Sequence, residues 1–271
     1  MPFSEELNVS LRAAWKAAAR IRDDYQKWVP IPDAPASIST ATDHAAQEII
    51  LQEIRASYPN DALCAEEATE TLRQAPRSGE RVWVVDPIDG TRGFAMKNGE
   101  FSVMIALLVR GQIQLGVVLE PATEKVVFAE RGKGCWRCVG TEEKPVRCQV
   151  SLNVDLNHAR FTRSRSKTAR NSPLTARVRP TEWIETFSSG LKLALVAEGR
   201  ADAYVNTYPE FNSWDVCAGQ ILVEEAGGCV TTLTGRPIEY SDQPQQRQGL
   251  IASNGRIHQV IVEALRSPDH R

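Results

Sequence analysis

The sequence has no hydrophobic run long enough to cross a membrane. Its longest strictly apolar run covers residues 103–109, whereas a membrane-spanning helix needs about 20 apolar residues. Charge of one sign is not in excess either, because 32 basic side chains face 34 acidic ones and the net charge is −2. This balance provides no overall field for nucleic acid or an anionic membrane surface. We therefore expect neither a membrane nor a nucleic acid as partner.

Cysteine is also scarce, since six residues in a chain of 271 are too few for a disulfide scaffold. Cys135 and Cys138 form a CxxC pair, but no second pair follows at zinc-finger spacing. We interpret the cysteines as reduced thiols in a cytoplasmic protein. The alternative is that the CxxC pair binds a metal or has a redox role. Glu5, Glu6 and Arg12 interrupt the first apolar residues, so no signal peptide is expected.

What the chain does have is an ordinary globular composition, with 42% apolar and 24% charged residues. Its length suits one large or two modest domains, and we expect a division into residues 1–150 and 151–271. Hydrophobic periodicity and turn residues define the elements. The expected helices cover residues 4–28, 42–56, 191–197 and 216–226, and the expected strands 61–65, 82–85, 102–110, 114–119, 126–130 and 203–205.

Six carboxylates stand at the ends of these elements: Asp43, Glu66, Glu67, Asp86, Asp89 and Asp215. The strand over 82–85 should end abruptly at Asp86, at the strand end where α/β proteins commonly bind ligands. Pro87 fixes the following turn, so Asp89 can return to the same point. Two like charges this close require a cation between them, and Mg²⁺ suits an all-oxygen site best. The alternative is a solvated turn that caps a helix.

The other acids also have plain structural interpretations. Asp215 follows Trp214 and opens the expected helix that Gly227-Gly228 ends, so it could be an N-cap. Glu66-Glu67 could be exposed acids after a strand. The four histidines show no metal-ligand spacing, and His44 is expected to be a helix-surface residue. Only the assembly of acids favours a metal site over these alternatives.

Three segments of the chain carry a family resemblance. They are Ala65-Glu66-Glu67-Ala68-Thr69, Trp83-Val84-Val85-Asp86-Pro87-Ile88-Asp89-Gly90-Thr91 and Trp214-Asp215-Val216-Cys217-Ala218-Gly219, with Thr40-Ala41-Thr42-Asp43 upstream. In these segments the sequence resembles the magnesium-dependent, typically lithium-sensitive phosphomonoesterases that include inositol monophosphatase, fructose-1,6-bisphosphatase and 3'(2'),5'-bisphosphate nucleotidase. The resemblance implies an α/β (α+β) fold, a layered αβαβα sandwich.

The resemblance also implies roles for individual residues. It places a first Mg²⁺ on Glu66, Asp86 and the Ile88 carbonyl, and a second on Asp86, Asp89 and Asp215. Glu67 would serve a third ion or its water shell. Thr91, hydrogen-bonded to Asp43, would orient the attacking water, and the Gly90 and Thr91 amides would hold the phosphate. The chemistry fits, because metal ions can neutralise an anionic ester and activate water.

Less widely shared residues bear on the substrate. Gly90-Thr91-Arg92-Gly93-Phe94 and Asn98-Gly99-Glu100-Phe101-Ser102-Val103 are similar to bisphosphate nucleotidases, as are segments containing Arg165, Ser189 and Lys192. Inositol-specific relatives carry an acid where this chain has Tyr208, which could stack on a purine, although Glu210 lies nearby. Residues 31–39 depart from the family pattern; in relatives this loop lies near the metal site and can influence third-metal binding and specificity.

A basic stretch adds an electrostatic argument. Its members are Arg160, Arg163, Arg165, Lys167, Arg170, Arg177 and Arg179. An exposed loop without a target is one interpretation; the other is that Arg165, with Lys192, neutralises a second phosphate on the substrate. Of aromatic residues only Phe161 interleaves with this stretch, which disfavours nucleic-acid binding.

Together these observations predict a Mg²⁺-dependent phosphomonoesterase, with two or three ions, acting on a small phosphate ester. The preferred substrate is adenosine 3',5'-bisphosphate, cleaved to AMP and phosphate. The alternatives are an inositol-, histidinol- or sugar-phosphate phosphatase and, in a different class, a catalytically silent metal- or nucleotide-binding module. The chain is expected to act as a monomer or homodimer.

Overall fold

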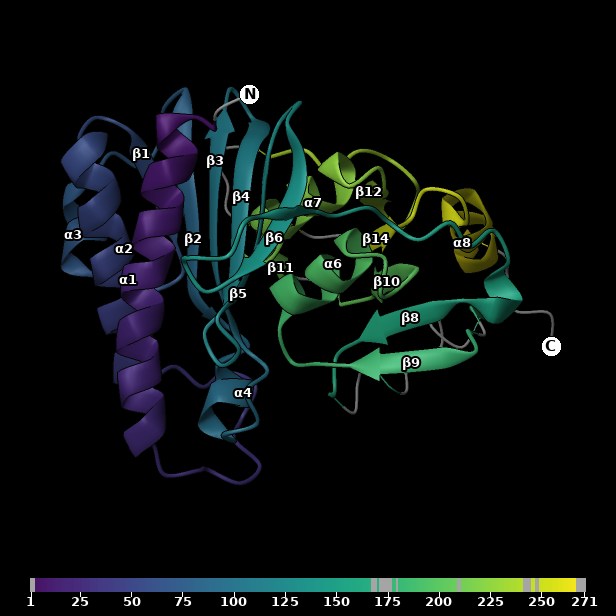
Figure 1. The fold of residues 1–271 in the computed structure, drawn as a ribbon, viewed down its shortest axis with the longest axis horizontal. Helices are drawn as coiled ribbons and strands as arrows, with labels where there is room; N and C mark the ends of the chain where they lie inside the picture. The colour runs from purple at the N-terminus through teal and green to yellow at the C-terminus, as the bar shows by residue number, and fades with distance from the viewer. Residues whose placement is uncertain are drawn as a thin grey trace.

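In the computed structural model, two long helices, α1 (Glu5–Lys27) and α2 (Ala41–Ser57), pack side by side as the first layer of the fold (Figure 1). The hydroxyl of Ser4 caps α1 by accepting from the Leu7 amide at 3.2 Å, and Glu5 and Glu6 favour this positive helix end. Thr40 and Asp43 form a capping box that starts α2. Both expected helices are confirmed.

The second layer is a seven-stranded sheet in which the strands follow one another in chain order. The structure describes residues 3–166, 170, 177–178, 180–208, 211–240, 245–246 and 249–266. The strands of this sheet are β1 (Ala62–Ala65), β2 (Arg81–Asp89), β3 (Ser102–Val109), β4 (Gln112–Glu120), β5 (Lys125–Glu130), β6 (Gly134–Val139) and β7 (Val146–Arg147). Helices cover both faces, so the continuous apolar run of β3 is buried on both sides.

Strand β2 differs from the expectation that it ends at Asp86. Its pairing with β3 resumes at Asp89, because Asp86 lies opposite Met104 and Asp89 opposite Ser102. One extra residue on β2 therefore forms a bulge, in the segment that holds Pro87, whose missing N–H suits an interrupted ladder. The bulge keeps both aspartates on one strand and turns their side chains out of simple alternation.

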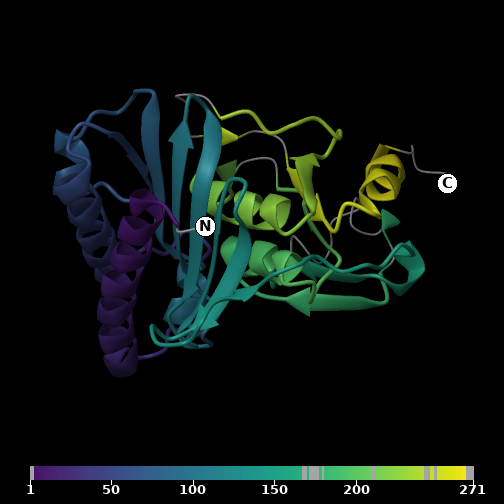
Figure 2. The ribbon, with the colours of Figure 1, turned by 45° about the horizontal axis from the view of Figure 1, so that its top comes forward.

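Two helices form the middle layer, α6 (Ser189–Ala197) and α7 (Cys217–Glu225), and lie between the two sheets in both ribbon views (Figures 1 and 2). Gly116 lets β4 and α7 pack closely, since a Cβ at this position would lie 2.4 Å from the Ala218 carbonyl oxygen. As expected, α7 ends before Gly227, whose φ of +93° suits glycine.

The remaining layers are a five-stranded sheet and the outer helix α8 (His258–Arg266). The strands, in spatial order, are β12 (Cys229–Thr232), β14 (Leu250–Ser253), β10 (Ala203–Asn206), β8 (Arg160–Arg163) and β9 (Glu182–Glu185). Short elements complete the chain: α3 (Glu70–Gln74), α4 (Thr91–Ala95), η1 (Leu156–His158), β11 (Phe211–Asn212) and β13 (Gln245–Gln246). The αβαβα sandwich is confirmed.

The two sheets come from different halves of the chain, one before residue 150 and the other after it. The domain division at residue 150 stays a prediction. The CxxC pair is split by the sheet, because Cys135 packs into the core that contains α6 and α7, whereas Cys138 packs against the core under α1 and α2. The two thiols point to opposite faces and do not form one metal site.

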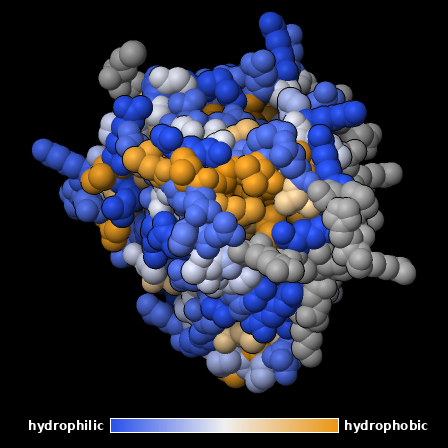
Figure 3. Space-filling model, turned by 90° about the vertical axis from the view of Figure 1, so that its right-hand side faces the viewer, coloured by the Kyte–Doolittle hydropathy of each residue, from blue (hydrophilic) through white to orange (hydrophobic). Residues whose placement is uncertain are grey.

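Among the described residues, none of the helices combines the length and hydropathy of a bilayer span. Figure 3 shows apolar side chains gathered in a band across the end of the molecule that carries α8. Exposed large apolar residues of the described chain include Leu152, Val154 and Val260.

Candidate active site

Three aspartates from distant parts of the chain converge at the bulge of β2. Each of Asp86, Asp89 and Asp215 offers one carboxylate oxygen, and these atoms lie within 4.8 Å of one another. Asp86 is 1% exposed and Asp89 6% exposed, so both carboxylates are nearly enclosed. An enclosed all-carboxylate donor set fits a hard divalent cation, the kind of metal the sequence predicts.

Asp89 is anchored through one of its two oxygens. Oδ2 accepts hydrogen bonds from the Ser188 hydroxyl, from the Gly190 amide at 2.7 Å and from the Ser102 hydroxyl at 3.4 Å. Since these bonds all end on Oδ2, the other oxygen is available to an ion. Ser188 and Gly190 belong to the start of α6, which thereby fixes the orientation of the carboxylate.

Asp215 is not the N-cap of α7. The cap position is Val216, which makes no side-chain cap, and Asp215 Oδ2 instead accepts from the Asn212 amide at 2.7 Å. Burial and the neighbouring Asp89 raise the pKa of Asp215 to about 7. The capping alternative is therefore wrong, and this carboxylate belongs to the acidic cluster.

Glu66 and Glu67 follow β1 and have different surroundings. Glu66 shares a hydrogen bond with Asp86, and burial together with Asp215 raises the pKa of Glu66 to about 8. The Glu66 side chain keeps an exposed surface, and repulsion from Glu67 and Asp43 also raises its pKa. Glu67 is buried and accepts from Ser39 Oγ at 2.7 Å, while His44 Nε2 lies 3.1 Å from it. The alternative that Glu66 and Glu67 are exposed acids after a strand is therefore wrong for Glu67.

The raised pKa values share one physical origin. Burial is the largest cause for Asp86, whose pKa lies well above its ordinary value, and Glu66, Asp89 and Asp215 add repulsion. Four acids with mutually unfavourable charges are stabilised by a cation placed among them. The fit of the donor set to a metal therefore rests on charge as well as on distance.

Thr91 and Asp43 are brought together, as the resemblance implies. Thr91 Oγ1 lies 2.8 Å from Asp43 Oδ1 and 2.9 Å from the Ile88 carbonyl oxygen. Asp43 is fully buried and its other oxygen accepts from the Thr40 amide at 2.9 Å. Burial raises the pKa of Asp43. One hydroxyl proton serves both acceptors, and a charged Asp43 is the stronger of the two.

Gly90 closes the turn between Asp89 and α4. It has a φ of +86°, and a Cβ there would lie 2.8 Å from the Glu100 carbonyl oxygen and 3.1 Å from the Ser188 backbone. Only glycine fits this position without displacing backbone. The turn therefore packs directly on the segments that contain Glu100 and Ser188.

Of the expected substrate-binding residues, some lie beside the acidic cluster and others do not. Lys192 is 2% exposed and donates to the carbonyls of Phe187 at 3.1 Å and Ser188 at 2.7 Å, and burial lowers the pKa of Lys192 to about 8. Ser189 is buried and hydrogen-bonds Tyr204. Tyr208 is 58% exposed on the coil after β10. The structure thus brings Ser189 and Lys192 to α6, beside Asp89, but does not join Tyr208 to the acidic cluster.

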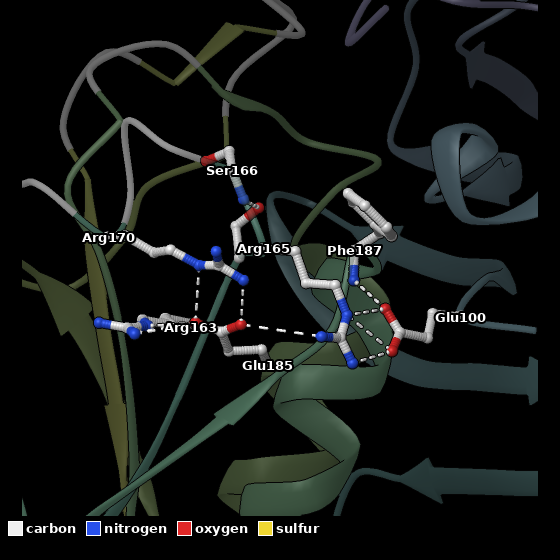
Figure 4. Close-up of polar contacts among 8 residues, drawn as sticks. Glu100, Arg163, Arg165, Ser166, Arg170, Glu185 and Phe187 are labelled. Atoms are coloured by element: carbon white, nitrogen blue, oxygen red, sulfur yellow. Dashed lines mark hydrogen bonds and ion pairs between the residues drawn. The ribbon is translucent and has the colours of Figure 1, made fainter. Parts of the chain in front are cut away.

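Arg165 is an ion-pair partner in this structure (Figure 4). Its Nε lies 2.8 Å and 2.7 Å from the two carboxylate oxygens of Glu100. Lys167, Arg179 and Glu210, which the sequence also singled out, lie outside the described residues.

Several contact residues were missed by the sequence analysis. Ser102 and Ser188 hold Asp89, and Ser39 with His44 holds Glu67. His44 is half-exposed on α2, as expected, but it is also paired. Ser188 before the apolar helix over 191–197 carried a helix-start signal that could have identified it. Ser39 lies in the divergent segment 31–39, which therefore does contact the acidic site.

The chain is similar in sequence to several known proteins. The chain is 35% identical over 204 residues to the 3'(2'),5'-bisphosphate nucleotidase CysQ of Salmonella typhimurium (74% of this chain, 79% of the relative). It is 32% identical over 229 residues to a fructose-1,6-bisphosphatase/inositol-1-monophosphatase of Thermotoga maritima (84% and 82%) and 31% identical to the Nus factor SuhB of Escherichia coli (96% and 95%).

A solved structure of an IMPase from Thermotoga maritima superposes with a TM-score of 0.81 at 29% identity, covering 97% of each chain. The CysQ structure of Bacteroides thetaiotaomicron gives 0.76 at 26% identity, covering 93% of this chain and 98% of that one. A family model described as the inositol monophosphatase family matches residues 4–269. The chain therefore belongs to the inositol monophosphatase family, whose members are phosphatases.

Proposed function

We propose that the protein is a Mg²⁺-dependent phosphomonoesterase. The observation that carries this proposal is the convergence of Asp86, Asp89 and Asp215 within 4.8 Å in a nearly enclosed site. Glu66, Asp86 and the Ile88 carbonyl would hold one ion, and the three aspartates a second, with Glu67 serving a third. Bound Mg²⁺ would supply the positive charge that lets a nucleophile approach an anionic phosphate and that activates water.

The chain's own residues would orient the reactants. With its proton donated to Asp43, the Thr91 hydroxyl presents lone pairs that can accept a hydrogen bond from the attacking water and so orient it. The Gly90 and Thr91 amides would bind phosphate oxygens at the tight turn after Asp89. Asp43 acts through Thr91 as a positioning residue.

The proposed substrate is a 3'(2')-phosphorylated adenosine 5'-phosphate. The similarity of residues 90–94 and 98–103 to bisphosphate nucleotidases supports it, as does the 35% identity to CysQ. Tyr208 is exposed and offers a ring on which a purine could stack. A specific observation favours the alternative, a sugar or polyol monophosphate: Arg165 is already paired with Glu100, and Lys192 is buried.

The test is phosphate release from a substrate panel in the presence of Mg²⁺. The panel contains adenosine 3',5'-bisphosphate, inositol 1-phosphate, histidinol phosphate and fructose 1,6-bisphosphate. We expect adenosine 3',5'-bisphosphate to give the highest kcat/KM. Preference for another ester would reject the substrate but keep the reaction, whereas no release from any ester would favour a catalytically silent binding module.

A further inference from the structure

A cluster of arginines and carboxylates lies between the second sheet and the segment after α4 (Figure 4). Arg165 forms a bidentate ion pair with Glu100, in which Nε lies 2.7 Å from Oε2 and Nη2 lies 2.5 Å from Oε1. Its third nitrogen, Nη1, is 3.7 Å from Glu185. A forked contact of this kind is the same one that a guanidinium makes with a phosphate.

Glu185 has arginine partners of its own. Arg163 Nη2 lies 2.8 Å from Glu185, and Arg170 Nε lies 2.9 Å from it. These pairs lower the pKa of Glu185, with Arg170 the largest cause. Glu185 is therefore satisfied without Arg165, and Glu100 is the principal anion that compensates Arg165. Three guanidinium groups share two carboxylates, which leaves this described cluster one positive charge in excess.

The cluster is connected to the acidic site through backbone. The Glu100 carboxylate also accepts from the Phe187 amide at 3.2 Å, and the next residue, Ser188, donates to Asp89. On the other side, the Glu100 carbonyl packs against Gly90, which follows Asp89. Glu100 and Arg165 thus stand beside both segments that position Asp89.

We infer that Glu100 pairs with the Arg165 guanidinium where a second anionic group of the substrate would otherwise bind it. This pair thereby sets the selectivity between esters with one phosphate and esters with two. This inference rests on the proposed phosphomonoesterase activity rather than on the proposed substrate, and it deepens that activity by naming what sets its substrate class. A second phosphate can bind Arg165 only by displacing the Glu100 carboxylate. The displaced carboxylate then lies beside the phosphate dianion, and the two like charges repel each other. An ester with one phosphate and neutral hydroxyl groups meets no such competition. Glu100 is a positioning residue that acts through Arg165.

Glu100→Gln tests the inference, because glutamine keeps the length of the side chain and an acceptor for the Phe187 amide but loses the charge. We expect KM for adenosine 3',5'-bisphosphate to fall about five-fold relative to KM for inositol 1-phosphate, the effect of one partly exposed ion pair. The ratio of the two kcat values should stay the same. Adding Arg165→Ala to Glu100→Gln should abolish the gain, since the released guanidinium is then absent.

Glu53→Gln is the matched control, because Glu53 also pairs with two cations, Arg12 and Lys16, but on α1 and α2. It should leave the KM ratio unchanged. An equal change in KM for both substrates in Glu100→Gln, or no change, overturns the inference. If the wild type hydrolyses neither ester, the proposed function fails. Calorimetry then tests the inference separately, by comparing the binding affinity for adenosine 3',5'-bisphosphate with that for AMP in wild type and Glu100→Gln. Selectively tighter binding of the bisphosphate to Glu100→Gln supports it, and unchanged binding overturns it.

Discussion

Asp86 is the carboxylate that the other acids surround, and its pKa is raised by burial and by Glu66, Asp89 and Asp215. We predict that Asp86→Asn lowers kcat/KM at least about 100-fold, because an amide cannot replace a charged metal ligand. In metal-free buffer the variant should be at least as stable as wild type, since it lacks one of the repelling charges. Phosphate release and thermal melts measure the two effects; near-normal turnover would contradict the proposed mechanism.

Thr91 offers a finer test of water orientation. Removing its hydroxyl in Thr91→Ala should lower kcat about 10- to 100-fold and leave KM nearly unchanged, because the hydroxyl aligns the nucleophile rather than the ester. Thr91→Ser keeps the hydroxyl that lies 2.8 Å from Asp43 and should retain most of the activity. A rise in KM at constant kcat would instead assign Thr91 to substrate binding.

At the scale of single residues, the sequence located the acids but not their partners. Asp86 and Asp89 lie in a short segment that carries the family resemblance, so the sequence predicted them together with the other acids. The Ser188 hydroxyl that holds Asp89 lies 99 positions further along the chain, and Arg165 lies 65 positions from Glu100. Such pairs follow from the packing of α6 and of the second sheet on the first, which local pattern does not encode.

At the scale of elements, the contact between β4 and α7 sets the position of Asp215. A Cβ on Gly116 would lie 2.4 Å from the Ala218 carbonyl oxygen, which is backbone and cannot move alone. We predict that Gly116→Ala destabilises the protein by about 1–3 kcal/mol and weakens Mg²⁺ binding. Gly79→Ala is the control, because its nearest neighbours would lie at 3.7 Å. Denaturant unfolding and metal titration measure both effects; a neutral Gly116→Ala would contradict this packing.

The junction of β12, β14 and α8 contains the buried His258. Its ring nitrogens lie 2.9 Å from the hydroxyls of Thr231 and Ser253, and burial lowers the pKa of His258. The neutral ring is favoured in the fold, so its stabilising contribution is present above the unfolded pKa of about 6.5 and is lost as pH falls below it. We predict that the melting temperature of wild type falls relative to that of His258→Gln as pH decreases from 7.5 to 5.5 in the same buffer. Parallel pH profiles would contradict this.

Prediction of elements from the sequence succeeded where periodicity is long or strongly apolar, as in α1, α2 and β3. It placed the end of β2 wrongly, because a proline usually ends a strand and here the ladder resumes beyond a bulge. The strands β8 and β9 were not predicted, since Arg160, Arg163, Glu182 and Glu185 make them look like a polar loop. Arg163 of β8 pairs with Glu185 of β9 across the strands, and Arg160 lies 3.8 Å from Asp202.

At the scale of the whole molecule, metal binding should be coupled to stability and pH. The raised pKa values, about 8 for Glu66 and about 7 for Asp215, mean that metal-free protein loses stability as pH rises from about 4, where these acids ionise in the unfolded chain, to about 8, where Glu66 ionises in the fold. Mg²⁺ at 100 times its Kd should add about 2.7 kcal/mol. We predict a larger rise in melting temperature on adding Mg²⁺ at pH 8 than at pH 6, because protons compete with the ion. Equal rises at both pH values would contradict this.

The carboxylates of the proposed site belong to both halves of the chain, with Asp86 and Asp89 on the first sheet and Asp215 just before α7. During synthesis from the N-terminus, the first sheet and its two outer helices emerge long before the third aspartate does. A nascent chain therefore exposes an incomplete, uncompensated set of acids to the solvent. It gains the full donor set only when α7 docks between the sheets, so capture of the ion would mark a late step of folding.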